Sequence, residues 1–92
     1  MELSRSVRIV NAAGLHARPC HAIVQTAMEF PCSLRIRNHA VGGDGVNGKS
    51  ILQLMTLEAS QGAELELFVE GDQGEELLKS LQSLIEGGFG ES

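Results

Sequence analysis

Glu64-Leu65-Glu66-Leu67-Phe68-Val69-Glu70 is the stretch that decides the fold of this chain. Leu65, Leu67 and Val69 occupy every second position, which predicts a β-strand with one face turned toward a core. Glutamates dominate the other face. Because opposite charges attract across neighbouring strands, an acidic strand is best placed between two strands that carry basic residues. The segment 64–70 is therefore predicted to be a central strand.

Two other segments alternate in the same way, and both are basic on their polar face. Residues 3–9 carry Arg8 there, and residues 32–37 carry Arg35 and Arg37. If the acidic strand lies between them, the strand order is 1-4-2, with the last strand in the middle. This order is a split β-α-β arrangement.

A helix is predicted between the first two strands. Its apolar residues recur at spacings of three and four: Ala17, Cys20, Ile23, Val24, Ala27 and Met28. Pro19 is compatible with a first helical turn, where its missing N–H would have no intrahelical partner. The helix is therefore expected to start near His16 and to close at Phe30-Pro31.

The middle of the chain predicts a hairpin and a short helix. Residues 38–48 contain four glycines and two asparagines, a composition typical of a turn or flexible hairpin, with Ala40-Val41 as the candidate for a short strand. Ser50 can cap a short apolar helix that runs from Ile51 to about Leu57. Gln61-Gly62 then makes a turn.

A last helix follows the acidic strand. Asp72 and Glu75 have the spacing of a capping box at its start, and Gly87 can end it. Its apolar stripe comprises Leu77, Leu78, Leu81, Leu84 and Ile85. One apolar face on each strand and one stripe on each helix predict two layers, with the helices on one side of the sheet.

Length and composition limit the classes of protein. The chain has 92 residues, the length of one domain covering 1–92, and its charged content of 21% is that of an ordinary soluble protein. A net charge of −5 and the absence of Trp and Tyr argue against nucleic-acid binding. Apolar runs are too short for a membrane span, and no secretory signal is visible, so a cytoplasmic location is expected. Cys20 and Cys32 are expected to be core thiols.

The segment Gly14-Leu15-His16-Ala17-Arg18-Pro19 carries the chemistry. The free N–H groups and the dipole at a helix start favour an anion and disfavour a protonated ring, so the imidazole of His16 keeps a nucleophilic lone pair. Arg18 can donate to two phosphate oxygens at once. These residues suit a histidine that accepts a phosphoryl group transiently. The alternative is a histidine that only caps the helix.

The same six residues resemble the active-site signature of the HPr family, the histidine-containing phosphocarriers of the bacterial sugar phosphotransferase system. Asn47-Gly48-Lys49-Ser50-Ile51 resembles the regulatory-serine segment of that family, and the likeness extends over nearly the whole chain. It implies an α+β open-faced sandwich: a four-stranded antiparallel sheet in the order 1-4-2-3, covered on one face by three helices.

The resemblance also implies roles for individual residues. Enzyme I would phosphorylate His16 on Nδ1 with phosphate from phosphoenolpyruvate, and the phosphoryl group would pass to a IIA domain or a related regulator. Arg18 and the backbone of Ala17 and Arg18 would hold the phosphate. The partner-docking residues would be Ala17, His21, Ile51, Leu52 and Met55. The protein would be a monomeric carrier without cofactor or metal, and not a turnover enzyme.

Ser50 would be the site of an HPr kinase/phosphorylase. A phosphate at a helix cap is tolerated by the helix but adds charge beside an apolar docking patch. The alternative function is a purely regulatory binding module that acts through Ser50 and a partner protein. The presence of His16 argues against it, because regulatory relatives often lack that histidine.

The chain departs from the family pattern in several places. A few extra residues lie in the hairpin, around Gly42-Gly43-Asp44-Gly45. Cys20 and His21 stand where small residues are common, and three positions that are often lysine hold Gln25, Met28 and Gln53. The identity of the partners and the salt dependence of docking are therefore left open.

Two other motifs fit the sequence less well. Residues 43–50 match the P-loop pattern, but the strands expected here do not form the parallel sheet that a P-loop needs. Residues of the types that bind zinc are also present, but no two of them form a C-x-x-C pair, so their spacing does not favour a zinc site. These residues are His16, Cys20, His21, Cys32 and His39. Phe89, in a glycine-rich tail, is expected to be a loose cap on the core.

Overall fold

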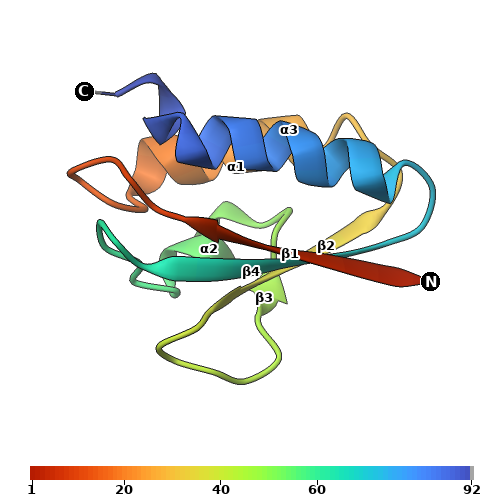
Figure 1. Cartoon of the computed structure of the whole chain (residues 1–92), viewed down its shortest axis with the longest axis horizontal. Helices are drawn as coiled ribbons and strands as arrows, with labels where there is room; N and C mark the ends of the chain where they lie inside the picture. Colours follow the sequence, from red (N-terminus) through yellow and green to blue (C-terminus); the bar gives the residue numbers. More distant parts are fainter. Residues whose placement is uncertain (92) are drawn as a thin grey trace.

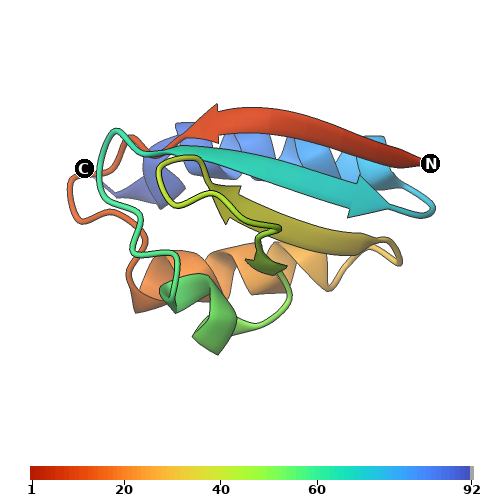
Figure 2. The ribbon, with the colours of Figure 1, turned by 90° about the horizontal axis from the view of Figure 1, so that it is seen from below.

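The computed structural model describes residues 1–91, which form two layers, a β-sheet and the helices that cover it (Figure 1). The elements in chain order are β1 (Glu2–Arg8), α1 (Ala17–Ala27), β2 (Ser33–Asn38), β3 (Val46–Asn47), α2 (Ile51–Met55), β4 (Glu64–Glu70), α3 (Gly74–Glu86) and a 3₁₀ turn, η1 (Gly88–Gly90). The sheet is antiparallel in the order β1-β4-β2-β3, as predicted. Seen from below, α1 and α3 run side by side across one face of the sheet (Figure 2).

The charges on the outer sheet face pair as the sequence predicts. Glu64 of β4 lies opposite Arg8 of β1, with an oxygen 3.4 Å from its guanidinium. Glu66 of β4 lies opposite Arg37 of β2 and forms an ion pair with it. The prediction that the acidic strand is central is therefore confirmed, and two of its glutamates pair with basic residues of the neighbouring strands.

The core lies between the sheet and the two long helices. The inward residues Leu65, Leu67 and Val69 are fully buried, and both cysteines are buried with them, as expected. Phe89 is half-buried against this core. No helix in the described part of the chain is long and apolar enough to cross a membrane.

The short strand of the hairpin lies later than expected. Val41 and Gly42 both donate their backbone N–H to the Asn38 carbonyl, at 3.0 Å, so Ala40-Val41 lies in a turn. Strand β3 forms instead at residues 46–47, once the chain has come back alongside β2. Gly45 allows this return, since a Cβ there would lie 2.7 Å from the Ile36 carbonyl oxygen.

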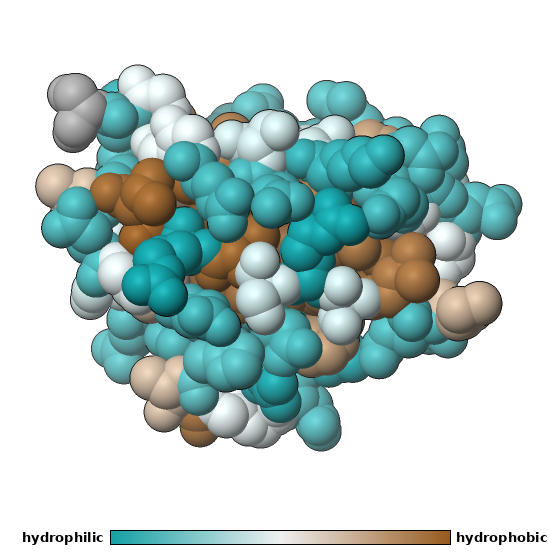
Figure 3. Space-filling model, in the orientation of Figure 1, coloured by the Kyte–Doolittle hydropathy of each residue, from teal (hydrophilic) through white to brown (hydrophobic). Residues whose placement is uncertain are grey.

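The predicted capping box at the start of α3 is wrong. Gln73, with a left-handed φ of 65°, is the residue before the helix, and its side chain makes no capping bond. The carboxylate of Glu75 is instead bound by Arg5 of β1, at 2.7 and 2.9 Å, and Arg5 also donates to Gln82. These contacts join α3 to β1. Hydrophilic side chains break up the apolar surface on the face of the molecule seen in Figure 3.

Candidate functional site

The loop between β1 and α1 places His16 at the start of the helix. The backbone N–H of Leu15 donates to the Ala59 carbonyl at 2.9 Å, which ties the loop to the segment before β4. Gly14 has a φ of 70°, and a Cβ at this position would lie 2.7 Å from the same carbonyl oxygen. The close approach of the two segments therefore requires glycine. His16 is the last extended residue before α1, with φ −89° and ψ −171°.

The His16 side chain does not cap the helix. His16 occupies the N-cap position of α1, but its side chain makes no capping hydrogen bond. Its Nε2 lies 3.0 Å from Oε2 and 3.3 Å from Oε1 of Glu91. Within residues 1–91 the other ring nitrogen, Nδ1, has no hydrogen-bond partner, and 42% of the side chain is exposed. The nitrogen that the family resemblance assigns as acceptor is the one left open.

Glu91 is a site residue that the sequence did not reveal. The 3₁₀ turn Gly88–Gly90 carries it back over the loop before α1, where Asn11 Nδ2 donates to its Oε1 at 3.0 Å. Asn11 is 3% exposed and donates from the same nitrogen to the Gly14 carbonyl at 2.8 Å. The glycine-rich segment before Glu91 was a signal for a turn, but not for the surface on which that turn would lie.

The first turn of α1 offers donors to an anion beside His16. Ala17 and Arg18 are exposed, and their backbone N–H groups belong to the first helical turn, where no intrahelical acceptor exists. Among the described residues Arg18 makes no hydrogen bond or ion pair, so its guanidinium is available to a ligand. Pro19 is buried in that first turn, as expected.

Ser50 caps α2, as predicted. Its Oγ accepts a hydrogen bond from the backbone N–H of Gln53 at 3.2 Å, and the side chain is half-buried. The preceding Lys49 donates from Nζ to the Phe30 carbonyl at 3.0 Å. Strand β3 interrupts the P-loop-like segment 43–50, which therefore does not form the single loop from strand to helix that binds nucleotide phosphates.

The predicted docking residues come from two helices that pack together. Helix α2 contacts α1, and Figure 2 shows the two side by side. On α2, Leu52 is 81% and Met55 44% exposed, while Ile51 is half-buried against the core. Ala17 and His21 are exposed on α1. The structure thus exposes four of the predicted docking residues on two helices that contact each other, and gives Ile51 a partly structural place.

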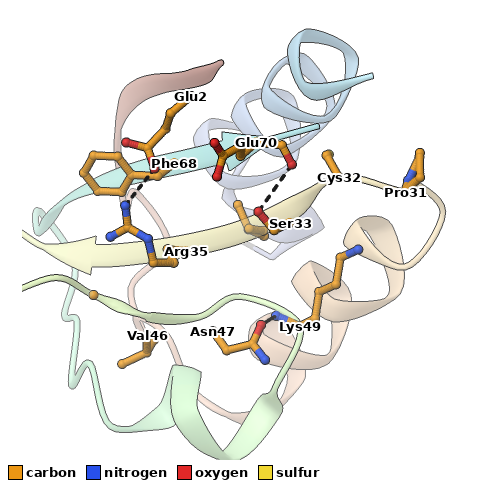
Figure 4. A pocket seen from close by; sticks show the side chains of 12 residues that line it. Glu2, Pro31, Cys32, Ser33, Arg35, Val46, Asn47, Lys49, Phe68 and Glu70 are labelled. Atoms are coloured by element: carbon orange, nitrogen blue, oxygen red, sulfur yellow. Dashed lines mark hydrogen bonds and ion pairs between the residues drawn. The ribbon is translucent and has the colours of Figure 1, made fainter. Parts of the chain in front are cut away.

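A hollow of about 660 Å³ lies on the outer face of the sheet, away from His16 (Figure 4). Arg35 stacks over the Phe68 ring, with its central carbon 4.5 Å from the ring centre, and reaches Glu2 at 2.9 Å. Lys49 also lines the hollow and is bound to the Phe30 carbonyl. Arg35 is therefore already paired with a carboxylate, and Lys49 is already hydrogen-bonded to the backbone.

The candidate metal ligands do not assemble. Among the described residues, no three His, Cys, Asp or Glu side chains come close enough to hold a metal ion. Cys20, one helical turn after His16, points into the core, and burial raises the pKa of its thiol because the thiolate is poorly solvated there. It is a packing residue.

Comparison with known proteins points to one family. Residues 3–87 match a family model described as "PTS HPr component phosphorylation site". The chain is 39% identical over 89 residues to a phosphocarrier protein HPr of Neisseria meningitidis, covering 97% of each chain. It is 36% identical to a multiphosphoryl transfer protein of Vibrio cholerae, in which the match spans 21% of the length.

The fold is likewise that of solved HPr structures. The crystal structure of HPr-C-His from Thermoanaerobacter tengcongensis superposes with a TM-score of 0.88, at 41% identity and with 98% of each chain covered.

Proposed function

The chain belongs to the HPr family, the phosphocarriers of the phosphotransferase system, and from this premise we propose that His16 accepts a phosphoryl group from phospho-enzyme I and passes it to a IIA domain. The observation that supports this most strongly is the state of the His16 ring. Its Nε2 is held by Glu91 at 3.0 Å, while Nδ1 is open and the side chain is partly exposed. A ring held in this way presents one nucleophilic nitrogen to an incoming phosphorus.

The transfer itself needs few groups on this chain. The Nδ1 lone pair attacks phosphorus in line as the bond to the donor breaks, and the donor keeps that electron pair. The Arg18 guanidinium and the backbone N–H groups of Ala17 and Arg18 then donate hydrogen bonds to the phosphoryl oxygens and stabilise their negative charge. The onward transfer to a IIA domain would use the same contacts as the phosphoryl group leaves Nδ1, which returns the protein to its starting state as a carrier.

Docking would use the apolar surface beside His16. Leu52 and Met55 expose side chains on α2, and Ala17 and His21 are exposed on α1, which contacts α2. The relative in which such a segment makes up 21% of a multiphosphoryl transfer protein supports a role among phosphoryl-transfer proteins. Phosphorylation of Ser50, at the edge of this surface, would then weaken docking.

Replacing the acceptor tests the proposal. Wild type, incubated with enzyme I and phosphoenolpyruvate, is expected to gain one acid-labile phosphate by intact mass. The His16→Ala variant should gain none and keep the wild-type circular dichroism, since the side chain lies outside the core. His39→Ala is the matched control, because His39 is exposed on another loop. Acid-labile phosphate on His16→Ala would show that another residue is the acceptor.

A further inference from the structure

We propose that Glu91 is the positioning residue of the phosphoryl acceptor. Its carboxylate accepts a hydrogen bond from the Nε2–H of His16, fixes the tautomer in which Nδ1 carries the lone pair, and lies beside the positive charge that the ring acquires on phosphorylation. This inference rests on the proposed function of His16. It assigns a role to a residue that neither the sequence motif nor the docking surface includes.

The contact between His16 and Glu91 is partly buried and is supported by further hydrogen bonds, unlike an ion pair on an open surface. Glu91 Oε2 and Oε1 lie 3.0 and 3.3 Å from Nε2, and only 22% of the Glu91 side chain is exposed. Oε1 also accepts from Asn11 Nδ2 at 3.0 Å. Asn11 is itself almost fully buried and bound to the Gly14 carbonyl. The carboxylate thus lies between a fixed amide and the imidazole.

The backbone after α3 is shaped to deliver this carboxylate. Gly88 and Gly90 have φ values of 73° and 74°, and Phe89 between them has 57°, a conformation that is rare for residues other than glycine. The Glu91 N–H closes the turn on the Gly88 carbonyl at 2.9 Å. The Phe89 side chain packs on the core. A left-handed phenylalanine persists only where surrounding contacts hold it.

The chemistry of the pair follows from the proton count. A neutral imidazole carries one N–H, and a carboxylate can only accept, so the proton lies on Nε2 and the lone pair on Nδ1. When Nδ1 bonds to phosphorus and the bond to the donor breaks, the ring keeps its Nε2 proton and becomes cationic. The nearby carboxylate stabilises that charge, and the aligned ring needs no reorientation. No proton is gained or lost in the step.

The tautomer can be measured without any partner protein. In wild type, ¹⁵N spectra of the His16 ring at neutral pH should show Nε2 as the protonated nitrogen and Nδ1 as the unprotonated one. In Glu91→Ala the two signals should move toward each other, because the tautomers then mix. Glu76→Ala is the control, since Glu76 is exposed at the opposite end of α3. Unmoved ring signals in Glu91→Ala would overturn the inference.

Kinetics test the consequence. Glu91→Gln should be phosphorylated on His16 about tenfold more slowly than wild type, because the charge of the carboxylate is lost, and Glu91→Asp should recover part of the rate, with unchanged melting temperatures. Glu76→Gln should behave as wild type. If Glu91→Gln reacts as fast as wild type, or faster, the carboxylate does not support the acceptor. If wild type itself takes up no acid-labile phosphate, the proposed function fails, and the ring spectra still decide the inference about Glu91.

Discussion

Substitution of Gly14 by alanine should be unusually destabilising, and the structure separates the reasons. Gly14 has a φ of 70°, which costs an L-residue about 1–2 kcal/mol. A Cβ there would also lie 2.7 Å from the Ala59 carbonyl oxygen and 3.0 Å from the Ser60 Cα, so backbone must move. Because the Ala59 carbonyl accepts from the Leu15 N–H, that movement also weakens a hydrogen bond, at a cost of about 1 kcal/mol.

Gly43 provides the matched control. Its φ of 77° is similar, but a Cβ there would meet nothing within 4 Å. Gly14→Ala is therefore expected to lower the free energy of unfolding by about 3 kcal/mol and Gly43→Ala by about 1 kcal/mol, since only the first has a steric conflict. For a chain of this size each kcal/mol lowers the melting temperature by about 4–8 °C.

Urea unfolding of the two variants and wild type, followed by circular dichroism, measures the difference directly. Phosphorylation of His16 should also slow in Gly14→Ala, because the loop that places the ring has moved, and should be unchanged in Gly43→Ala. Equal losses of stability in the two variants would refute the argument, because they would mean that the approach of residues 14 and 59 places no constraint on the fold.

Three further outcomes are expected. Arg18→Lys keeps the charge but loses the planar pair of donors, so phosphoryl transfer measured by rapid quench should slow while the melting temperature is unchanged. An equal rate would show that Arg18 does not take part in the transfer. Ser50→Asp retains a helix cap, so it should be as stable as wild type. It should nevertheless bind enzyme I about tenfold more weakly when measured by calorimetry. An affinity equal to that of wild type would show that Ser50 only caps the helix. The pKa of the Cys20 thiol is raised by burial, so the thiol ionises more readily in the unfolded state than in the folded one. Wild type should therefore lose stability relative to Cys20→Ala as the pH rises past the ordinary thiol value of 9.0. Urea midpoints of the two proteins that change in parallel with pH would contradict this.

Much of the architecture was determined by the sequence alone, because the forces involved act between near neighbours or along one strand face. Alternation in residues 64–70 made that segment a strand, and its glutamates required basic strands on both sides. The motif that placed His16 and Arg18 at a helix start relied on local helix geometry, which Pro19 reinforces. The cap at Ser50 is equally local.

Only the tertiary structure decided the features that depend on surfaces brought together by folding. The capping box failed because α3 begins after Gln73 and not after Asp72, and because the Glu75 carboxylate is bound by Arg5, 70 positions earlier in the chain. Glu91 meets His16 across 75 positions of sequence, because the core holds Phe89 and the turn around it directs the carboxylate onto Asn11. No periodicity or spacing in the sequence predicts such a contact. The partner of each polar group depends on where the ends of the helices and strands lie after the two layers have packed.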